Sequence, residues 1–294
     1  MDKFVIQGQK TLSGKVEVGG SKNAAGAILA ACLLTDGECI IDNLPLIEDI
    51  FNVLEVLKGI GVKVEMVGGR KARITVDSLD VEKIDFERMS KTRISVLFFG
   101  SFLPRMKHFK IAAPGGDKIG LRPISVHLRA LEKLGAEIKR QADFYTVDRG
   151  TLKGAEIVLE EFSVTATETV MLAAVLAEGK TIIKGAACEP HIQDLGRMLE
   201  KMGAKIKGAG THTIEIDGVK YLKGVSHNII FDSIEAGTFI VIGAVTPGKI
   251  TVKNVDLEYL DLFLEKLKET GVNFEKSQNS VTVSHSPNLN PVKI

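Results

Sequence analysis

The sequence predicts an α/β fold built from a repeated unit of about seventy residues. Four times, a stretch with helical spacing of apolar residues ends in a leucine, three further residues and a glycine. A run with the apolar pattern of a strand follows each glycine. The four glycines are separated by 74, 68 and 68 residues, and such regular returns indicate an internal repeat. They are Gly61, Gly135, Gly203 and Gly271.

The second of these phrases shows why a helix and then a strand are expected. Pro123 suits the first turn of a helix, because that turn does not need its N–H, and Gly135 suits a left-handed cap after it. "AEIKRQ", after the glycine, has the apolar pattern of a strand. The apolar positions that share one helical face are Ile124, Leu128, Leu131 and Leu134.

A second phrase repeats out of phase with the first. It is a helix rich in small residues, a turn with glycine and a strand, as in "TETVMLAAVLAEGKTIIKG". Small side chains would let helices approach closely, and "DSIE", from Asp232 to Glu235, predicts a capping box at the start of the third such helix. Each unit therefore reads as strand, helix, strand, helix, strand, strand, least regularly around "LFFGSFLPRMKHFKI". An open helical solenoid is the alternative, weakened by this strand content.

Composition narrows the classes of partner. The 294 residues carry a formal charge of +1 with acids and bases interleaved, and there is no Trp, so neither nucleic acid nor a membrane is expected as a partner. The three cysteines show no metal-ligand spacing, and Cys32 and Cys39 lie in apolar surroundings that indicate core positions. No signal peptide is apparent, and the longest apolar run, of eleven residues, is too short to span a bilayer. A reducing, cytoplasmic location is expected.

Three segments, "GGSKNAA", "APGGDKIGLRP" and "LEKLGAEI", together with the seventy-residue unit, resemble the enolpyruvyl transferases from Met1 to Ile294. The resemblance implies an inside-out α/β barrel of βαβαββ units, of which four out of six are present. It implies a complete three-unit domain over residues 22–231, and a partial second domain from 1–21 plus 232–294. Roughly 130 residues of the family's C-terminal part are then absent, by the repeat length.

The resemblance is closer to the branch that uses UDP-N-acetylglucosamine than to the shikimate branch. It implies transfer of the enolpyruvyl group of phosphoenolpyruvate to the sugar 3-hydroxyl, with release of phosphate, in peptidoglycan synthesis. No cofactor and no metal are implied, and no oligomeric state is predicted. A truncated, non-catalytic UDP-sugar-binding paralogue and a 3-phosphoshikimate 1-carboxyvinyltransferase are the alternatives.

Two segments carry cations at expected helix starts. Lys22 and Asn23 follow Ser21, and a lysine at a helix N-terminus adds charge where anions already bind, although a solvated lysine is the commoner reading. Arg122 stands before Pro123 at an expected helix start, where the helix dipole disfavours a cation. Its planar guanidinium suits either a phosphate or carboxylate ligand or a surface salt bridge. The resemblance makes Lys22 and Asn23 phosphoenolpyruvate contacts and implies substrate binding by Arg122.

The resemblance implies further substrate contacts in three segments. Arg93 begins an apolar helix and matches a family arginine near the substrates. His127 and Glu189 are supporting residues. The remaining substrate-binding positions are Pro123, Ile124, Ser125, Val126, Ser163, Val164 and Thr165.

Asp117 stands in the loop between Gly116 and Lys118. By itself Gly-Gly-Asp is ordinary turn chemistry. The resemblance places it where most of the family carry a reactive cysteine that acts as general acid, so it implies catalysis by Asp117 together with Lys22 and Arg122. It also implies that fosfomycin, which alkylates that thiol, will not inhibit. The family's general base lies in a "PTD" segment that this sequence does not contain.

Overall fold

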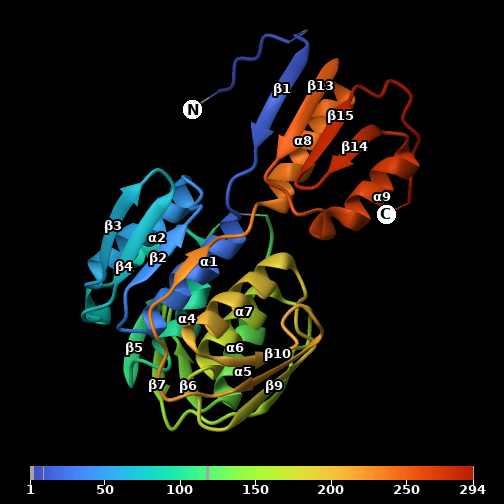
Figure 1. Ribbon diagram of the computed structural model, residues 1–294. Helices are drawn as coiled ribbons and strands as arrows, with labels where there is room; N and C mark the ends of the chain where they lie inside the picture. The colour runs from blue at the N-terminus through green and yellow to red at the C-terminus, as the bar shows by residue number, and fades with distance from the viewer. Residues whose placement is uncertain (1–2, 9, 117–118, 294) are drawn as a thin grey trace. The chain divides into compact units, whose positions relative to one another are not determined.

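The computed structural model describes residues 3–8, 10–116 and 119–293. Its contacts divide the chain into two compact units, Ser21–Ile230 and a second formed by Met1–Gly20 with Phe231–Ile294. Each unit has its own sheets and helices (Figure 1). That these units are one complete and one partial domain of a larger protein stays a prediction.

The four predicted phrases of helix, glycine and strand are confirmed. Each glycine has a positive φ, between 91° and 109°, which ends a helix in the left-handed region where glycine is least strained. A strand begins within two residues of each glycine, so the same local chemistry recurs in all four. The helices are α2 (Glu48–Gly59), α5 (Ser125–Lys133), α7 (Pro190–Met202) and α9 (Asp261–Thr270), and the strands are β3 (Lys63–Gly68), β6 (Ala136–Arg140), β10 (Lys205–Lys207) and β14 (Asn273–Ser277).

The unit of residues 21–230 contains three sheets, each with an outer helix and an inner helix. The inner helices are α1 (Lys22–Ala31), α4 (Leu97–Phe102) and α6 (Val164–Ala174), and all three contact one another. Short helical turns η1 (Cys32–Leu34), η2 (Val81–Lys83), η3 (Arg93–Val96) and α3 (Phe86–Met89) connect them. The other strands are β2 (Cys39–Asp42), β4 (Lys71–Thr75), β5 (His108–Ala112), β7 (Phe144–Arg149), β8 (Glu156–Val158), β9 (Lys180–Lys184), β11 (Thr213–Asp217) and β12 (Ser226–Asn228).

The second unit has one sheet, whose order is β1-β13-β15-β14 (Figure 1). Helix α8 packs against β13 and β15. Asp232 caps α8, accepting bonds from the N–H groups of Ile234 and Glu235, but the predicted capping box is only half formed, because Asp232 donates its own N–H to the carbonyl of Gly19. The Glu235 carboxylate bonds to the N–H of Gly19, 2.7 Å away. The elements not yet named are β1 (Leu12–Glu17), α8 (Ser233–Val245), β13 (Gly248–Lys253), η4 (Leu257–Leu260) and β15 (Ser280–Ser284).

Three of the four sheets share one strand order, which explains the repeat. In β8-β9-β11-β10, β12-β2-β4-β3 and β1-β13-β15-β14 a leading strand runs parallel to the next, and a hairpin completes the sheet. The sheet β5-β7-β6 has three strands, and its first strand, β5, begins within the stretch that the sequence marked as least regular. The fold is thus mixed α/β with several sheets, and none of the sheets formed by the described residues closes into a barrel.

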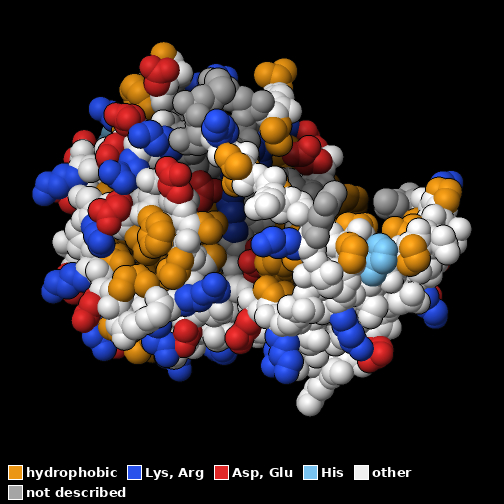
Figure 2. All heavy atoms as spheres, turned by 90° about the horizontal axis from the view of Figure 1, so that it is seen from above, with side chains coloured by type: hydrophobic (Ala, Val, Ile, Leu, Met, Phe, Trp, Pro, Cys, Tyr) orange, Lys and Arg blue, Asp and Glu red, His pale blue; other side chains and the backbone are white. Residues whose placement is uncertain are grey.

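Burial agrees with the apolar pattern. Residues 24–31 of α1 are all buried, as predicted for its apolar run, and Cys32 and Cys39 are core residues. One boundary prediction was wrong: α5 begins at Ser125 with Ile124 as its cap, so Pro123 precedes the helix and does not form its first turn. The described residues contain no helix long and apolar enough to cross a membrane. On the face shown in Figure 2, acidic and basic side chains are interspersed.

Asp194 of α7 has a buried carboxylate that contacts the last residues of the larger unit. Asp194 lies with one oxygen 3.2 Å from His227 Nε2 and 3.0 Å from Arg197 Nη2, and its other oxygen accepts the N–H of Ile230 at 3.1 Å. Burial by itself raises the pKa of Asp194, but these three partners outweigh it and hold the pKa below its ordinary value. The carboxylate therefore stabilises the folded unit.

Replacing this carboxylate is expected to destabilise the protein in a pH-dependent way. Asp194→Asn should lower the free energy of unfolding by about 3 kcal/mol at pH 7, because a buried polar cluster loses its only acid. Since the folded pKa is depressed, the wild-type advantage is complete above about pH 4, the unfolded value, and is lost as pH falls through the folded pKa. Urea unfolding at several pH values measures both effects.

The matched control is Asp77→Asn. Asp77 is half-exposed and forms an ion pair with Lys63. An exposed pair of this kind contributes under about 1 kcal/mol, so this variant should unfold like the wild type. Equal stability of the Asp194 and Asp77 variants at pH 7 would contradict the role given to Asp194.

Candidate functional site

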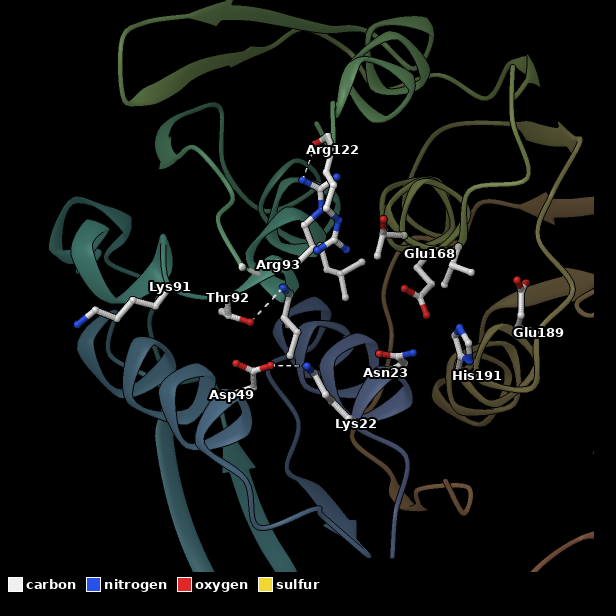
Figure 3. A pocket seen from close by; sticks show the side chains of 15 residues that line it. Lys22, Asn23, Asp49, Lys91, Thr92, Arg93, Arg122, Glu168, Glu189 and His191 are labelled. Carbon is white, nitrogen blue, oxygen red and sulfur yellow. Dashed lines mark hydrogen bonds and ion pairs between the residues drawn. The ribbon is translucent and has the colours of Figure 1, made fainter. Parts of the chain in front are cut away.

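The larger unit contains a pocket of about 460 Å³ where the N-terminal ends of its inner helices meet (Figure 3). Leu97 and Val164 supply apolar lining. The charged and polar lining comes from segments far apart in the sequence. These residues are Lys22, Asn23, Asp49, Lys91, Thr92, Arg93, Arg122, Thr165, Glu168, Glu189 and His191.

Lys22 is the first residue of α1. Ser21 caps this helix, accepting the N–H of Ala24 at 3.4 Å, so the side chain of Lys22 stands where helix dipole and ammonium charge are both positive. Its Nζ lies 2.6 Å from Asp49 Oδ2, in the first turn of α2. Both side chains are partly exposed, so an incoming anion competes with Asp49 for the ammonium group.

Arg93 links the second inner segment to the loop before α5. It follows Thr92, which caps η3, and its guanidinium donates to the carbonyls of Arg122, at 2.8 Å, and Pro123, at 3.3 Å. Burial, and then the charge of Arg122, lower the pKa of Arg93 from its usual value. These bonds fix the end of the loop and bring two guanidinium groups to the same pocket, where their repulsion favours a bound anion.

The loop of residues 113–123 is held at its start as well. Ala113 donates its N–H to the backbone carbonyl of Asp143 at 2.9 Å. A Cβ on Gly115 would stand 1.7 Å from the Ser90 carbonyl oxygen. Only glycine permits that approach. Gly116 has φ 102° and lines the pocket. Asp117, the predicted proton donor, lies outside the described residues, so its catalytic role stays a prediction.

The third inner segment contributes a neutral pair. Ser163 caps α6, and Thr165 Oγ1 lies 2.8 Å from Nε2 of the buried His127. Burial, and then the charge of Arg93, lower the pKa of His127 to about 4. His127 is therefore neutral near pH 7, and it orients Thr165 at the pocket wall.

Two acidic residues, Glu168 in α6 and Glu189 directly before α7, line the pocket. Glu189 is exposed and precedes α7 without a side-chain capping bond, whereas Glu168 is 1% exposed. Burial, and then the neighbouring charge of Glu189, raise the pKa of Glu168 well above its ordinary value. Figure 3 shows the Glu168 carboxyl pointing into the pocket, so one wall carries a carboxyl group whose neutral form is favoured by burial.

The predicted residues divide into two groups. The pocket is lined by Lys22, Asn23, Arg93, Arg122, Val164, Thr165 and Glu189. The second group, Pro123, Ile124, Ser125, Val126, His127 and Ser163, lies outside that lining, and Val126 borders a separate small hollow. Their substrate contacts stay predictions.

Asp49 and Glu168 also line the pocket, and neither was predicted from the sequence. A lone acid in the apolar stretch "TATETVMLAAV" was a signal for Glu168, because an acid inside a buried helix is rare. Asp49 gave no comparable signal, since an acid in the first turn of a helix is ordinary.

This arrangement suits a ligand with anionic groups and neutral polar groups. Lys22, Arg93 and Arg122 come from three segments and converge on one cavity. Across the described part of the chain no group of three or more His, Cys, Asp or Glu side chains could hold a metal ion. The pocket offers charge and hydrogen bonds from its own side chains.

Comparison with known proteins gives a consistent family. A profile described as EPSP synthase (3-phosphoshikimate 1-carboxyvinyltransferase) matches residues 6–294. UDP-N-acetylglucosamine 1-carboxyvinyltransferase 2 of Carboxydothermus hydrogenoformans is 44% identical over 100% of this chain and 70% of its own length. UDP-N-acetylglucosamine 1-carboxyvinyltransferase of Koribacter versatilis is 42% identical over 99% of this chain and 68% of its own length.

A solved structure shares the fold. The enolpyruvyl transferase NikO from Streptomyces tendae superposes with a TM-score of 0.87 at 20% identity, over 97% of this chain and 69% of that chain. At that identity the superposition shows a shared fold and nothing more. Family membership is shown by the profile match and by the relatives above 40% identity. The chain belongs to the enolpyruvyl transferase family of EPSP synthase.

Proposed function

We propose that this protein transfers the enolpyruvyl group of phosphoenolpyruvate to the 3-hydroxyl of UDP-N-acetylglucosamine and releases phosphate. The observation that carries the proposal is the convergence of Lys22, Arg93 and Arg122 on one pocket of about 460 Å³. Sequence identity of 42–44% to relatives named for this reaction supports it over transfer to a shikimate phosphate.

The pocket matches the charge of these substrates. Phosphoenolpyruvate has a phosphate and a carboxylate, and the nucleotide has a diphosphate, so several anionic groups need cations near one another. Lys22 adds its ammonium to a helix N-terminus, which is the arrangement that binds phosphate. Arg93 has five N–H donors, two of which bond to carbonyls, and the rest are available for a planar anion. Asn23 is an exposed amide beside Lys22.

The reaction also needs proton transfer. A group must protonate the methylene carbon of phosphoenolpyruvate, and another must take the proton of the sugar hydroxyl. We assign the first role to Asp117, which stands in the same loop segment as Arg122, with Lys22 and Arg122 as catalytic cations. We assign the base to no residue of this chain. Insensitivity to fosfomycin follows from the acid in place of a thiol.

The wider context follows from the reaction. Transfer to UDP-N-acetylglucosamine would serve as the first committed step of peptidoglycan synthesis, and thus cell wall biogenesis, cell shape and division. We place it in the cytoplasm, which agrees with three cysteines that are free thiols. We read the described sheets as four of the family's six βαβαββ units, arranged in the manner of an inside-out barrel.

The test uses the protein of residues 1–294 with phosphoenolpyruvate and either UDP-N-acetylglucosamine or shikimate 3-phosphate. Phosphate release is measured together with the product's enolpyruvyl proton signals. We expect release with the sugar nucleotide and not with the shikimate. Calorimetry with UDP-N-acetylglucosamine alone measures binding separately from turnover.

Each outcome has a distinct meaning. Nucleotide binding without phosphate release would favour a sugar-nucleotide-binding paralogue. Release with shikimate 3-phosphate would favour the other branch. If the folded protein neither binds the nucleotide nor releases phosphate, the proposal is contradicted.

A further inference from the structure

Glu168 is a buried acid, and no hydrogen bond from the residues that the structure describes accounts for its Oε1. It lies in α6, its side chain is 1% exposed, and it lines the pocket. Its Oε1 is sealed from solvent and has no hydrogen-bond partner among the residues that the structure describes. Buried polar atoms are nearly always paired, so an orphan atom at a pocket wall indicates a partner that arrives with a ligand.

The charge state of this group decides which ligand atoms it suits. A carboxylate without a partner is costly to bury, and burial together with Glu189 raises the pKa of Glu168 well above its ordinary value. The neutral carboxyl has one O–H donor and free acceptor positions. It therefore suits a group that both accepts and donates a hydrogen bond, such as a hydroxyl or an amide.

The surrounding groups separate the pocket into two sides. The ionisable groups on the neighbouring elements are Lys22 on α1, Arg93 on η3, Arg122 before α5, His127 on α5, and Glu189 and His191 at the start of α7. Lys22 forms an ion pair with Asp49, and Arg93 bonds to carbonyls of the loop before α5. The charge of Glu189 disfavours phosphates on the side of Glu168, so the anionic groups of a ligand belong with the cations.

We infer that Glu168 is a specificity residue for the acceptor, exchanging hydrogen bonds between its carboxyl group and a hydroxyl or amide group of the bound sugar nucleotide. The inference rests on the proposed function, because it requires a nucleotide sugar in this pocket. It adds a neutral recognition group to a site otherwise described by its cations.

The experiment measures binding of UDP-N-acetylglucosamine by calorimetry to the wild type, Glu168→Gln and Glu168→Leu. Glutamine also donates and accepts hydrogen bonds, so the Kd of Glu168→Gln should stay within about threefold of the wild-type value. Leucine keeps the volume and loses both bonds, so Kd should rise about 10- to 30-fold. The Kd for phosphoenolpyruvate alone should be unchanged in both variants. Glu178→Gln, an exposed acid that does not line this pocket, is the matched control.

A pH series separates recognition from a structural role. The neutral acid is the binding form, so the wild-type Kd should rise as pH increases through the raised pKa of Glu168, whereas the Kd of Glu168→Gln should stay level. A purely structural glutamate would change the unfolding temperature without this difference. If Glu168→Leu does not fold, the pH comparison alone decides.

The outcomes also separate this inference from the proposed function. The inference is overturned if Glu168→Leu binds the nucleotide as tightly as the wild type does. It is also overturned if the wild type and Glu168→Gln show the same pH dependence of Kd. Either result leaves the proposed function standing. Folded wild type that does not bind the nucleotide at all overturns both.

Discussion

Replacing Lys22 by alanine is expected to reduce phosphate release about 10²- to 10³-fold, the range for removing one preorganised group from a charged transition state. Lys22 is the cation at the N-terminus of α1, where Ser21 caps the helix. The helix cannot compensate for the lost charge, because its end carries only about half a unit charge. The affinity for phosphoenolpyruvate should fall with the rate. Initial rates and calorimetry on the same preparation measure both.

Two controls separate the role of the charge from that of the ion pair. Lys58 pairs with Glu55 at 2.7 Å on the exposed side of α2, so Lys58→Ala removes a similar pair away from the pocket and should leave the rate unchanged. Asp49→Asn removes the partner of Lys22 but keeps its ammonium group, so its rate should exceed that of Lys22→Ala. Wild-type turnover by Lys22→Ala would contradict the site.

Adding one methyl group at Gly100 is expected to destabilise the larger unit by about 3 kcal/mol, at the upper end of the range for overpacking a core. Gly100 lies in α4, and a Cβ there would stand 2.3 Å from the Thr169 carbonyl oxygen and 3.1 Å from Leu172 Cβ, both on α6. Because that oxygen belongs to the backbone, the helices must separate. Gly100→Ala should therefore lower the midpoint of urea unfolding.

The same change should impair the pocket, because α4 continues from the segment of Arg93 and α6 carries Glu168. The matched control is Gly59→Ala in α2, where the new Cβ would meet no atom closer than 3.8 Å. Alanine is the better helix former by about 1 kcal/mol, so this control should equal or exceed wild-type stability. Equal stability of the two variants would show that α4 and α6 are not in close contact.

Much of the fold could be predicted because its causes are local. Gly203 ends α7 with φ 109°, and Ser21 and Asp232 cap their helices, all within a few residues of chain. Apolar periodicity likewise indicated the inward face of α5, where Ile124, Leu131 and Leu134 are buried and Leu128 is partly buried. The start of α5 was misjudged because Pro123 suits either a first turn or the residues before a cap, and tertiary contacts chose the second.

The site was predictable where a motif marked it and unpredictable where the partner lies far away in sequence. Lys22, Arg93 and Arg122 were chosen from motifs, and all three line the pocket. Asp49 was missed because its ion pair with Lys22 joins two helices. The bonds from Arg93 to the carbonyls of Arg122 and Pro123 join residues about thirty positions apart, and no local pattern encodes them.

The repeat, the helix and strand types, the caps and the cationic motifs could be read from the amino-acid order, because each depends on spacing and on hydrogen bonds between near neighbours. Three properties needed the folded chain: Lys22 faces Asp49, His127 is neutral, and the Oε1 of Glu168 has no partner within the described chain. These properties arise from burial and from charges on distant segments, whose electrostatic effects depend on distances that folding sets.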